Sequence, residues 1–134
     1  MSVFLDTNVL VSAFASRGLC ADLLEVVLAD QDLVVGRNVL RELAKALREK
    51  VRLPVPRATE IVEFVAREAV DIVEGAAAAR VRVDPDDAKV LGEALQGRTE
   101  YFVTGDGALL ELRDLEGLRI RSPRQLWETL HGST

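Results

Sequence analysis

The chain has 134 residues, a formal net charge of −5 and a composition that is 49% hydrophobic but only 4% aromatic. This length suits one core, so we expect residues 1–134 to form a single domain, and the negative charge argues against binding of nucleic acid by bulk electrostatics alone. With one cysteine, Cys20, and one histidine, His131, the chain excludes an intrachain disulfide framework and a zinc site built from Cys and His.

The first predicted element is a short apolar strand that ends at a carboxylate. Residues 3–6 read Val-Phe-Leu-Asp, and Thr7 and Asn8 follow before a helix over 9–15. A short apolar run that ends in polar residues is typical of a buried strand of a parallel sheet. Asp6 then lies where ligands bind in open α/β sheets, or it only caps the helix that follows.

A basic stripe accompanies the next acidic candidate, Glu42. Helical periodicity resumes over 19–28, a second strand covers 32–36, and residues 37–52 form an amphipathic helix. Glu42 lies about 200° around this helix from the apolar Leu40, so the spacing alone favours a solvated side chain. The stripe beside Glu42 could hold a phosphate backbone or an acidic partner. Its members are Arg37, Arg41, Lys45, Arg48 and Arg52.

Prolines separate this helix from the next one. Pro54 and Pro56 lack an amide hydrogen and restrict the preceding residue, so the first helix ends before them. Apolar spacing predicts another helix over 56–69 and a short third strand over 70–73. Residues 75–80, a glycine followed by four alanines and an arginine, fit either a loop or a helical turn.

The second half of the chain begins with a strong helix start. Asp84 is the predicted N-cap, Pro85 takes the first helical position, and acids occupy the first turn of a helix that continues to about residue 97. This pattern explains the three aspartates of the run without any function. They are Asp84, Asp86 and Asp87.

Another strand ending in polar residues follows. Residues 100–103 form the fourth predicted strand, and a short helix over 107–112, a strand over 118–121 and a helix over 123–130 complete the chain. Leu126 and Trp127 would pack the last helix against the rest. Two candidate site residues come directly after the fourth strand: Thr104 and Asp106.

Four acids are therefore expected at one edge of the sheet: Asp6, Glu42, Asp87 and Asp106. A parallel sheet brings the carboxyl ends of its strands and the N-termini of the following helices to the same side. Carboxylates crowded there repel one another unless cations lie between them, and hard oxygen ligands suit Mg²⁺ or Mn²⁺. Such ions support hydrolysis of a phosphodiester, with Asn8 and Thr104 orienting ligands or water.

The same segments resemble the PIN-domain family, in particular the VapC-like toxin ribonucleases of toxin–antitoxin pairs. The resemblance rests on four motifs in order, which cover nearly the whole length: Val-Phe-Leu-Asp-Thr-Asn-Val-Leu at 3–10, Val-Leu-Arg-Glu-Leu at 39–43, Asp-Ala-Lys-Val-Leu at 87–91 and Val-Thr-Gly-Asp at 103–106. It implies an α/β fold, a three-layer sandwich in which a mostly parallel central sheet has helices on both faces.

The resemblance also assigns roles to residues. It makes Asp6, Glu42, Asp87 and Asp106 the catalytic and metal-binding quartet, with Mg²⁺ or Mn²⁺ as cofactor and RNA as substrate. The apolar spacing after Asp87 selects that residue as the third ligand and leaves Asp84 as the cap and Asp86 as a helper. The chain departs from similar sequences at Gly36, where they have a serine or threonine, and this alters how the helix of Glu42 is capped.

These features predict a metal-dependent endoribonuclease, the toxin of a toxin–antitoxin pair. Its partners would be RNA, a cognate antitoxin and a second copy of the chain, with Arg37, Arg41, Lys45 and Arg48 available to contact RNA or antitoxin. The alternative is a non-catalytic PIN-fold module that binds RNA or protein. Such a module is expected to have lost acids of the quartet, and this chain retains all four.

Two other folds that place an aspartate at the end of a strand fit this sequence less well. A phosphoacceptor receiver domain needs an acidic pair after the first strand, and a haloacid-dehalogenase-like phosphatase needs an aspartate at the position of Asn8.

No apolar run is long enough to span a membrane, and no basic segment precedes the N-terminal apolar stretch. We therefore expect a cytoplasmic protein with no membrane contact.

Overall fold

A computed structural model describes residues 1–132 of the chain, and its centre is a mostly parallel sheet. Within these residues the strand order is β3-β2-β1-β4-β6-β5, with every neighbouring pair parallel except the antiparallel β5 and β6. The strands are β1 (Ser2–Leu5), β2 (Asp32–Gly36), β3 (Asp71–Val73), β4 (Tyr101–Val103), β5 (Asp114–Leu115) and β6 (Leu118–Arg121).

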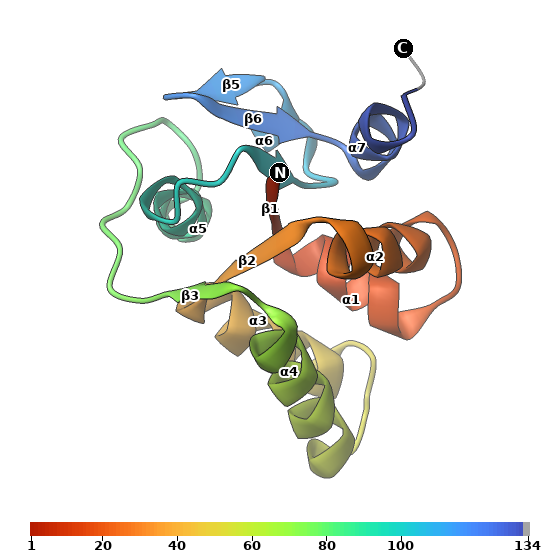
Figure 1. The fold of residues 1–134 in the computed structure, drawn as a ribbon. Coiled ribbons are helices and arrows are strands. Elements are labelled where there is room, and N and C mark those ends of the chain that lie inside the picture. Colours follow the sequence, from red (N-terminus) through yellow and green to blue (C-terminus); the bar gives the residue numbers. More distant parts are fainter. Residues whose placement is uncertain (133–134) are drawn as a thin grey trace.

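Helices cover both faces of the sheet. Those that connect β1 to β2 and β2 to β3 lie on one side of it, and α5 lies on the other (Figure 1). The predicted three-layer α/β fold is thereby confirmed. The helices are α1 (Thr7–Ala15), α2 (Leu19–Asp30), α3 (Arg37–Glu49), α4 (Val55–Glu68), α5 (Pro85–Gln96), α6 (Gly107–Leu110) and α7 (Pro123–Leu130). None of the described helices is long and apolar enough to cross a membrane.

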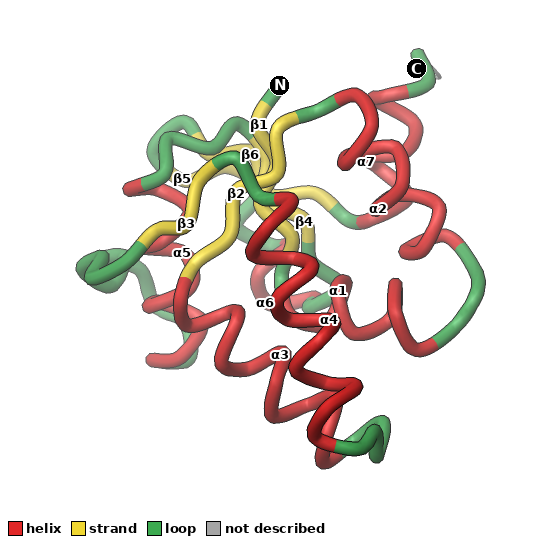
Figure 2. The backbone as a smooth tube through the Cα atoms, turned by 60° about the horizontal axis from the view of Figure 1, so that its bottom comes forward, coloured by secondary structure: helices red, strands yellow, loops and turns green. Residues whose placement is uncertain are grey.

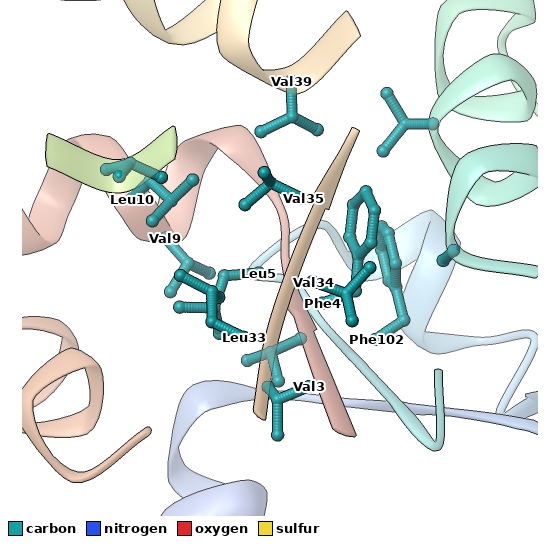
Figure 3. Packing of buried hydrophobic residues seen from close by; sticks show 14 of the residues in the cluster. Val3, Phe4, Leu5, Val9, Leu10, Leu33, Val34, Val35, Val39 and Phe102 are labelled. Atoms are coloured by element: carbon teal, nitrogen blue, oxygen red, sulfur yellow. The ribbon is translucent and has the colours of Figure 1, made fainter. Parts of the chain in front are cut away.

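The core forms on both faces because the central strands are apolar on both. Phe4 and Val34 point toward α5, where Phe4 stacks on Phe102 with ring centroids 5.5 Å apart, while Leu5 and Val35 point to the opposite side (Figure 3). Successive side chains of a strand alternate between faces, so a strand buried on both faces needs a continuous apolar run. This explains why the first strand reads as an uninterrupted apolar segment.

The helix that carries Glu42 is shorter than expected. It ends at Glu49, and Arg52 lies in the following turn with φ 64°. The amide of Leu53 donates to the carbonyl of Leu47, which folds the chain back before α4 begins. The predicted basic stripe on this helix therefore ends at Arg48. Together α3 and α4 form a hairpin that extends away from the sheet (Figure 2).

Two further segments refine the sequence predictions. Residues 75–80, left open between loop and helical turn, are a loop held against α5, where the Ala79 amide donates to the Ala88 carbonyl at 2.8 Å. Gly92 permits this approach, because a Cβ there would overlap the carbonyl of Ala77. The strand β5 was not predicted from the sequence, because two residues are too few to show an alternating pattern.

Candidate active site

Two of the four predicted acids lie at the point where the order of strands reverses. From β1 the chain proceeds to β2 and β3 on one side, and β4 and β6 lie on the other. Asp6 follows β1 and Asp106 follows β4, and the Asp6 amide donates to the carbonyl of Val103 at 2.9 Å. Crevices at such reversal points are where open α/β sheets bind ligands.

Thr104 joins these two acids. Its side chain is fully buried, and its hydroxyl donates to Oδ2 of Asp6 at 2.7 Å while accepting from the amide of Asp106 at 3.1 Å. The hydroxyl group has one proton and two lone pairs, so it can serve both neighbours at once. Thr104 therefore holds the loop after β4 beside the end of β1.

Asp6 combines the two roles that its sequence position suggested. It is the N-cap of α1, because Oδ1 accepts from the amide of Thr7 at 2.8 Å. Burial raises the pKa of Asp6, the hydrogen bonds from Thr104 and Thr7 oppose this rise, and the charges of Glu42 and Asp106 add to it. A capping carboxylate is thus held close to other carboxylates.

Glu42 lies inside the same site, although helical spacing alone favoured a solvated position. It is half-buried, and Oε1 accepts from the hydroxyl of Thr7 at 2.6 Å. The contact forms because α1 packs across α3, which covers a side of α3 that its own apolar stripe does not reveal. Thr7 was not among the predicted site residues. Its hydroxyl directly after Asp6 was the only signal in the sequence.

Asp87 completes the cluster from the first turn of α5. Its pKa is raised from 3.8 to about 6, first by burial and then by the charges of Asp6, Asp106, Asp84 and Glu42 in that order. A carboxyl group responds in this way when other carboxylates lie within electrostatic range. The structure therefore brings the four predicted acids together at one edge.

The neighbouring aspartates of α5 are placed differently. Asp84 is the N-cap of α5, as predicted, and accepts from the amide of Asp86 at 2.9 Å. Asp86 is exposed and does not line the cleft that contains Asp87. Asp87 is thus the acid of this run that faces the cluster.

A cleft of about 490 Å³ opens at the acids and continues between α1 and α3. Asn8 lines it, as expected, and Lys45 is the member of the predicted basic stripe that reaches it. Lys50 was missed, because it follows the last residue of α3 and falls outside the stripe. The lining residues are Asp6, Thr7, Asn8, Val11, Ser12, Glu42, Lys45, Ala46, Glu49, Lys50 and Asp87.

The remaining basic residues of α3 lie outside the cleft. Arg37 Nε is 3.7 Å from Glu74, and both side chains are exposed, so this ion pair contributes little stability. Arg41 donates to Asn38 at 2.7 Å, and Arg48 donates to a backbone carbonyl of its own helix. These three side chains form an exposed basic surface on α3.

The donor set agrees with a hard divalent cation in chemistry and in charge. It consists of carboxylate oxygens, which Mg²⁺ and Mn²⁺ prefer. The raised pKa of Asp87 reflects first its burial and then repulsion from the other acids, and a cation would relieve that repulsion. The acids lie near one another but are not arranged as a ligand set. Within residues 1–132, no three His, Cys, Asp or Glu side chains are positioned to hold a metal ion. Several instead accept hydrogen bonds, including Asp106 from the amides of α6.

The family and the fold of the chain have counterparts among known proteins. A family model described as PIN domain matches residues 2–108. Among solved structures, the crystal structure of VapBC2 from Rickettsia felis bound to a DNA fragment from their promoter contains a similar chain, with 13% sequence identity and a TM-score of 0.66. The match covers 91% of this chain and 98% of that one. No curated protein sequence matches the chain.

Proposed function

The chain belongs to the PIN-domain family, and from this membership and its four converging acids we propose that residues 1–134 form a PIN-like domain that hydrolyses RNA phosphodiester bonds as a metal-dependent endoribonuclease. The observation that carries the proposal is the convergence of Asp6, Glu42 and Asp87 on one cleft, with Asp106 joined to Asp6 through Thr104. The pKa of Asp87, raised to about 6 by burial and by the charges of the other acids, agrees with it. Strongly perturbed carboxyl groups in a cleft are typical of functional sites.

In this proposal Asp6, Glu42, Asp87 and Asp106 hold Mg²⁺ or Mn²⁺. Such an ion lowers the pKa of a bound water and stabilises the charge that develops on a phosphodiester. The protein supplies the carboxylates and holds them in place: Thr104 fixes Asp6, and Thr7 fixes Glu42.

The cleft supplies the groups that would bind the RNA. Lys45, on α3, and Lys50, which follows it, line the cleft beyond the acids, and their ammonium groups suit phosphates of a strand that continues along the cleft. Asn8 lines the cleft next to Asp6 and would orient water or a ligand there. Asp86, which does not line the cleft, would act as a helper only from outside it.

We further propose that the chain is the toxin of a toxin–antitoxin pair and acts in the cytoplasm as a homodimer. The structural relative from Rickettsia felis is a VapBC2 assembly bound to DNA, which supports an antitoxin partner for this chain. The exposed basic surface of Arg37, Arg41 and Arg48 beside the cleft would accept an acidic antitoxin segment or the RNA backbone.

The test of cleavage uses Asp6→Asn. Asparagine is also a good N-cap, so α1 should remain intact while the charge needed by a cation is lost. Purified parent and variant are incubated with a panel of single-stranded and hairpin RNAs in Mn²⁺, Mg²⁺ or EDTA. The matched control is Asp32→Asn, which removes an exposed carboxylate from the first residue of β2, at the opposite end of the strand.

We expect cleavage by the parent and by Asp32→Asn in Mn²⁺ or Mg²⁺, and none in EDTA or by Asp6→Asn. Cleavage by Asp6→Asn at the parental rate would refute the assignment of the acids. Folded proteins that cut no RNA of the panel would favour the alternative, a non-catalytic PIN-fold module that binds RNA or protein.

The toxin role has a separate test. The chain is co-expressed with the product of the adjacent gene, and growth and complex formation are measured. We expect the partner to restore growth and to bind the parent more tightly than a triple variant in which Arg37, Arg41 and Arg48 are replaced by alanine. A neighbouring product that does not bind would count against the toxin role while leaving the nuclease untouched.

A further inference from the structure

Glu93 is a buried acid of α5 that lies outside the cleft. Its side chain is 1% exposed, and Oε2 accepts from the amide of Asn38, in the first turn of α3, at 2.9 Å. The first amides of a helix have no partner within the helix. A carboxylate from another helix therefore caps α3.

Gly36 makes this arrangement possible. It is the N-cap position of α3 and supplies no side-chain cap, while its φ of −111° and ψ of 156° suit any residue. A Cβ at this position would overlap the carboxyl group of Glu93. The side chain that would normally cap the helix is thus missing, and Glu93 fills the space.

As a cap alone, Glu93 is a costly solution. Its Oε1 is buried without a hydrogen-bond partner, which is unfavourable for a polar atom. A serine at position 36 would cap α3 locally without burying a carboxylate. The contact provides something that a local cap cannot, because it ties α3 to α5.

These two helices carry two of the four acids. Glu42 lies on α3 and Asp87 lies in the first turn of α5. We propose that Glu93 is a positioning residue that sets where α3 presents Glu42 relative to Asp87. The proposal rests on the proposed function in that these acids form the metal site. Glu93 touches neither the cleft nor a reacting group, and it acts through the position of α3.

The test compares variants by their affinity for Mn²⁺ alone, measured by calorimetry on folded protein. Glu93→Ala removes the contact. The double variant Gly36→Ser/Glu93→Ala provides a local cap in the space that the carboxyl group leaves. The matched control is Ser122→Ala, which removes the capping hydroxyl of α7, far from the acids. The ¹³C shift of the Glu42 carboxyl carbon is recorded for each protein without metal.

We expect Glu93→Ala to weaken Mn²⁺ binding about tenfold, the size of effect seen when a group that orients ligands is removed. The Glu42 carbon shift should change with it. The double variant regains a cap but not the contact between α3 and α5, so it should recover thermal stability while its Mn²⁺ affinity and Glu42 carbon shift stay altered. Ser122→Ala should retain the parental affinity and shift while losing thermal stability. If Glu93→Ala does not fold, Glu93→Asp, which shortens the reach by one methylene, replaces it in the comparison.

A folded Glu93→Ala that binds Mn²⁺ as tightly as the parent would overturn the proposal and leave Glu93 as a cap. If the parent binds no Mn²⁺, the metal-dependent function fails, and the Glu42 carbon shift still decides about Glu93. A shift that is the same in parent and Glu93→Ala overturns the positioning role. A shift that changes in Glu93→Ala and stays changed in the double variant supports the positioning role, whereas a shift that returns in the double variant leaves Glu93 as a cap and overturns it.

Discussion

Removing the charge of Asp87 should stabilise the metal-free protein. Its pKa is raised from 3.8 to about 6, which corresponds to about 3 kcal/mol at 1.36 kcal/mol per pKa unit. Because the side chain is partly exposed, solvent screening reduces this to about 1.5 kcal/mol. Asp87→Asn also loses a favourable interaction with the N-terminus of α5, worth about 0.5 kcal/mol. The stabilisation from no longer burying a charge beside other carboxylates is the larger effect, and we expect a net gain of about 1 kcal/mol.

The pH dependence identifies the source of this gain. The pKa of Asp87 is higher in the folded protein than in the unfolded chain, so the folded state retains the proton longer. Below pH 3.8 both states are protonated and the charge has no effect. As pH rises from 3.8 to about 6, the unfolded state loses its proton first and the parent loses stability. The free energy of unfolding of Asp87→Asn should therefore exceed that of the parent by the full amount above about pH 6, and the two should not differ in this way below pH 3.8.

The assay is urea denaturation followed by circular dichroism, in EDTA, at pH values above and below this window. A gain of about 1 kcal/mol corresponds to about 4 °C in thermal midpoint for a domain of this size. The matched control is Asp86→Asn, an exposed acid of the same helical turn. It loses the interaction with the helix N-terminus without relieving the cluster, so it should lose about 0.5 kcal/mol.

Divalent cation should reverse the order of stability. A ligand at 100 times its dissociation constant stabilises the folded state by about 2.7 kcal/mol, and we expect the parent to gain this and Asp87→Asn to gain much less. The reasoning would be refuted by an Asp87→Asn protein that is no more stable than the parent in EDTA above pH 6, or by a gain that persists unchanged below pH 3.8.

Other perturbations give separate checks. Mn²⁺ affinity should fall as pH drops below about 6, because a cation must then displace the proton that Asp87 holds in the metal-free protein, and calorimetry across this range measures it. Thr104→Val removes the hydroxyl between Asp6 and Asp106 and should weaken Mn²⁺ binding about tenfold, as measured by calorimetry. An unchanged affinity would show that the two hydrogen bonds of Thr104 do not position the acids. Leu126→Ala, at the fully buried contact of α7, should cost about 3 kcal/mol in urea denaturation while Mn²⁺ affinity stays parental.

Much of the fold could be predicted from the sequence because its signals are local. The apolar run before Asp6 predicts a strand buried on both faces, and the Asp84-Pro85 start of α5 has the expected cap. Each depends on residues adjacent along the chain. The same holds for Asp6, which is both the cap of α1 and a member of the acidic cluster.

The contacts of the other site residues depend on how the helices pack against one another, which the sequence did not reveal. Helical spacing turned Glu42 away from the apolar stripe of α3, and only the crossing of α1 over α3 brings Thr7 to it. Of the predicted basic residues, Lys45 reaches the cleft, while Arg41 and Arg48 contact their own helix. Spacing within one helix cannot specify which face a second helix will cover.

The sequence by itself determined every described strand except β5, most of the helices and the motif order that identifies the acids. The tertiary structure alone decided which side chains from separate helices meet. Glu93 illustrates the difference: helical propensity says nothing of its capping role, because its partner amide belongs to Asn38 on α3, and two elements, α4 and β3, separate α3 from α5 along the chain. Periodicity describes one helix at a time, whereas the distance between two helices depends on how the whole core packs.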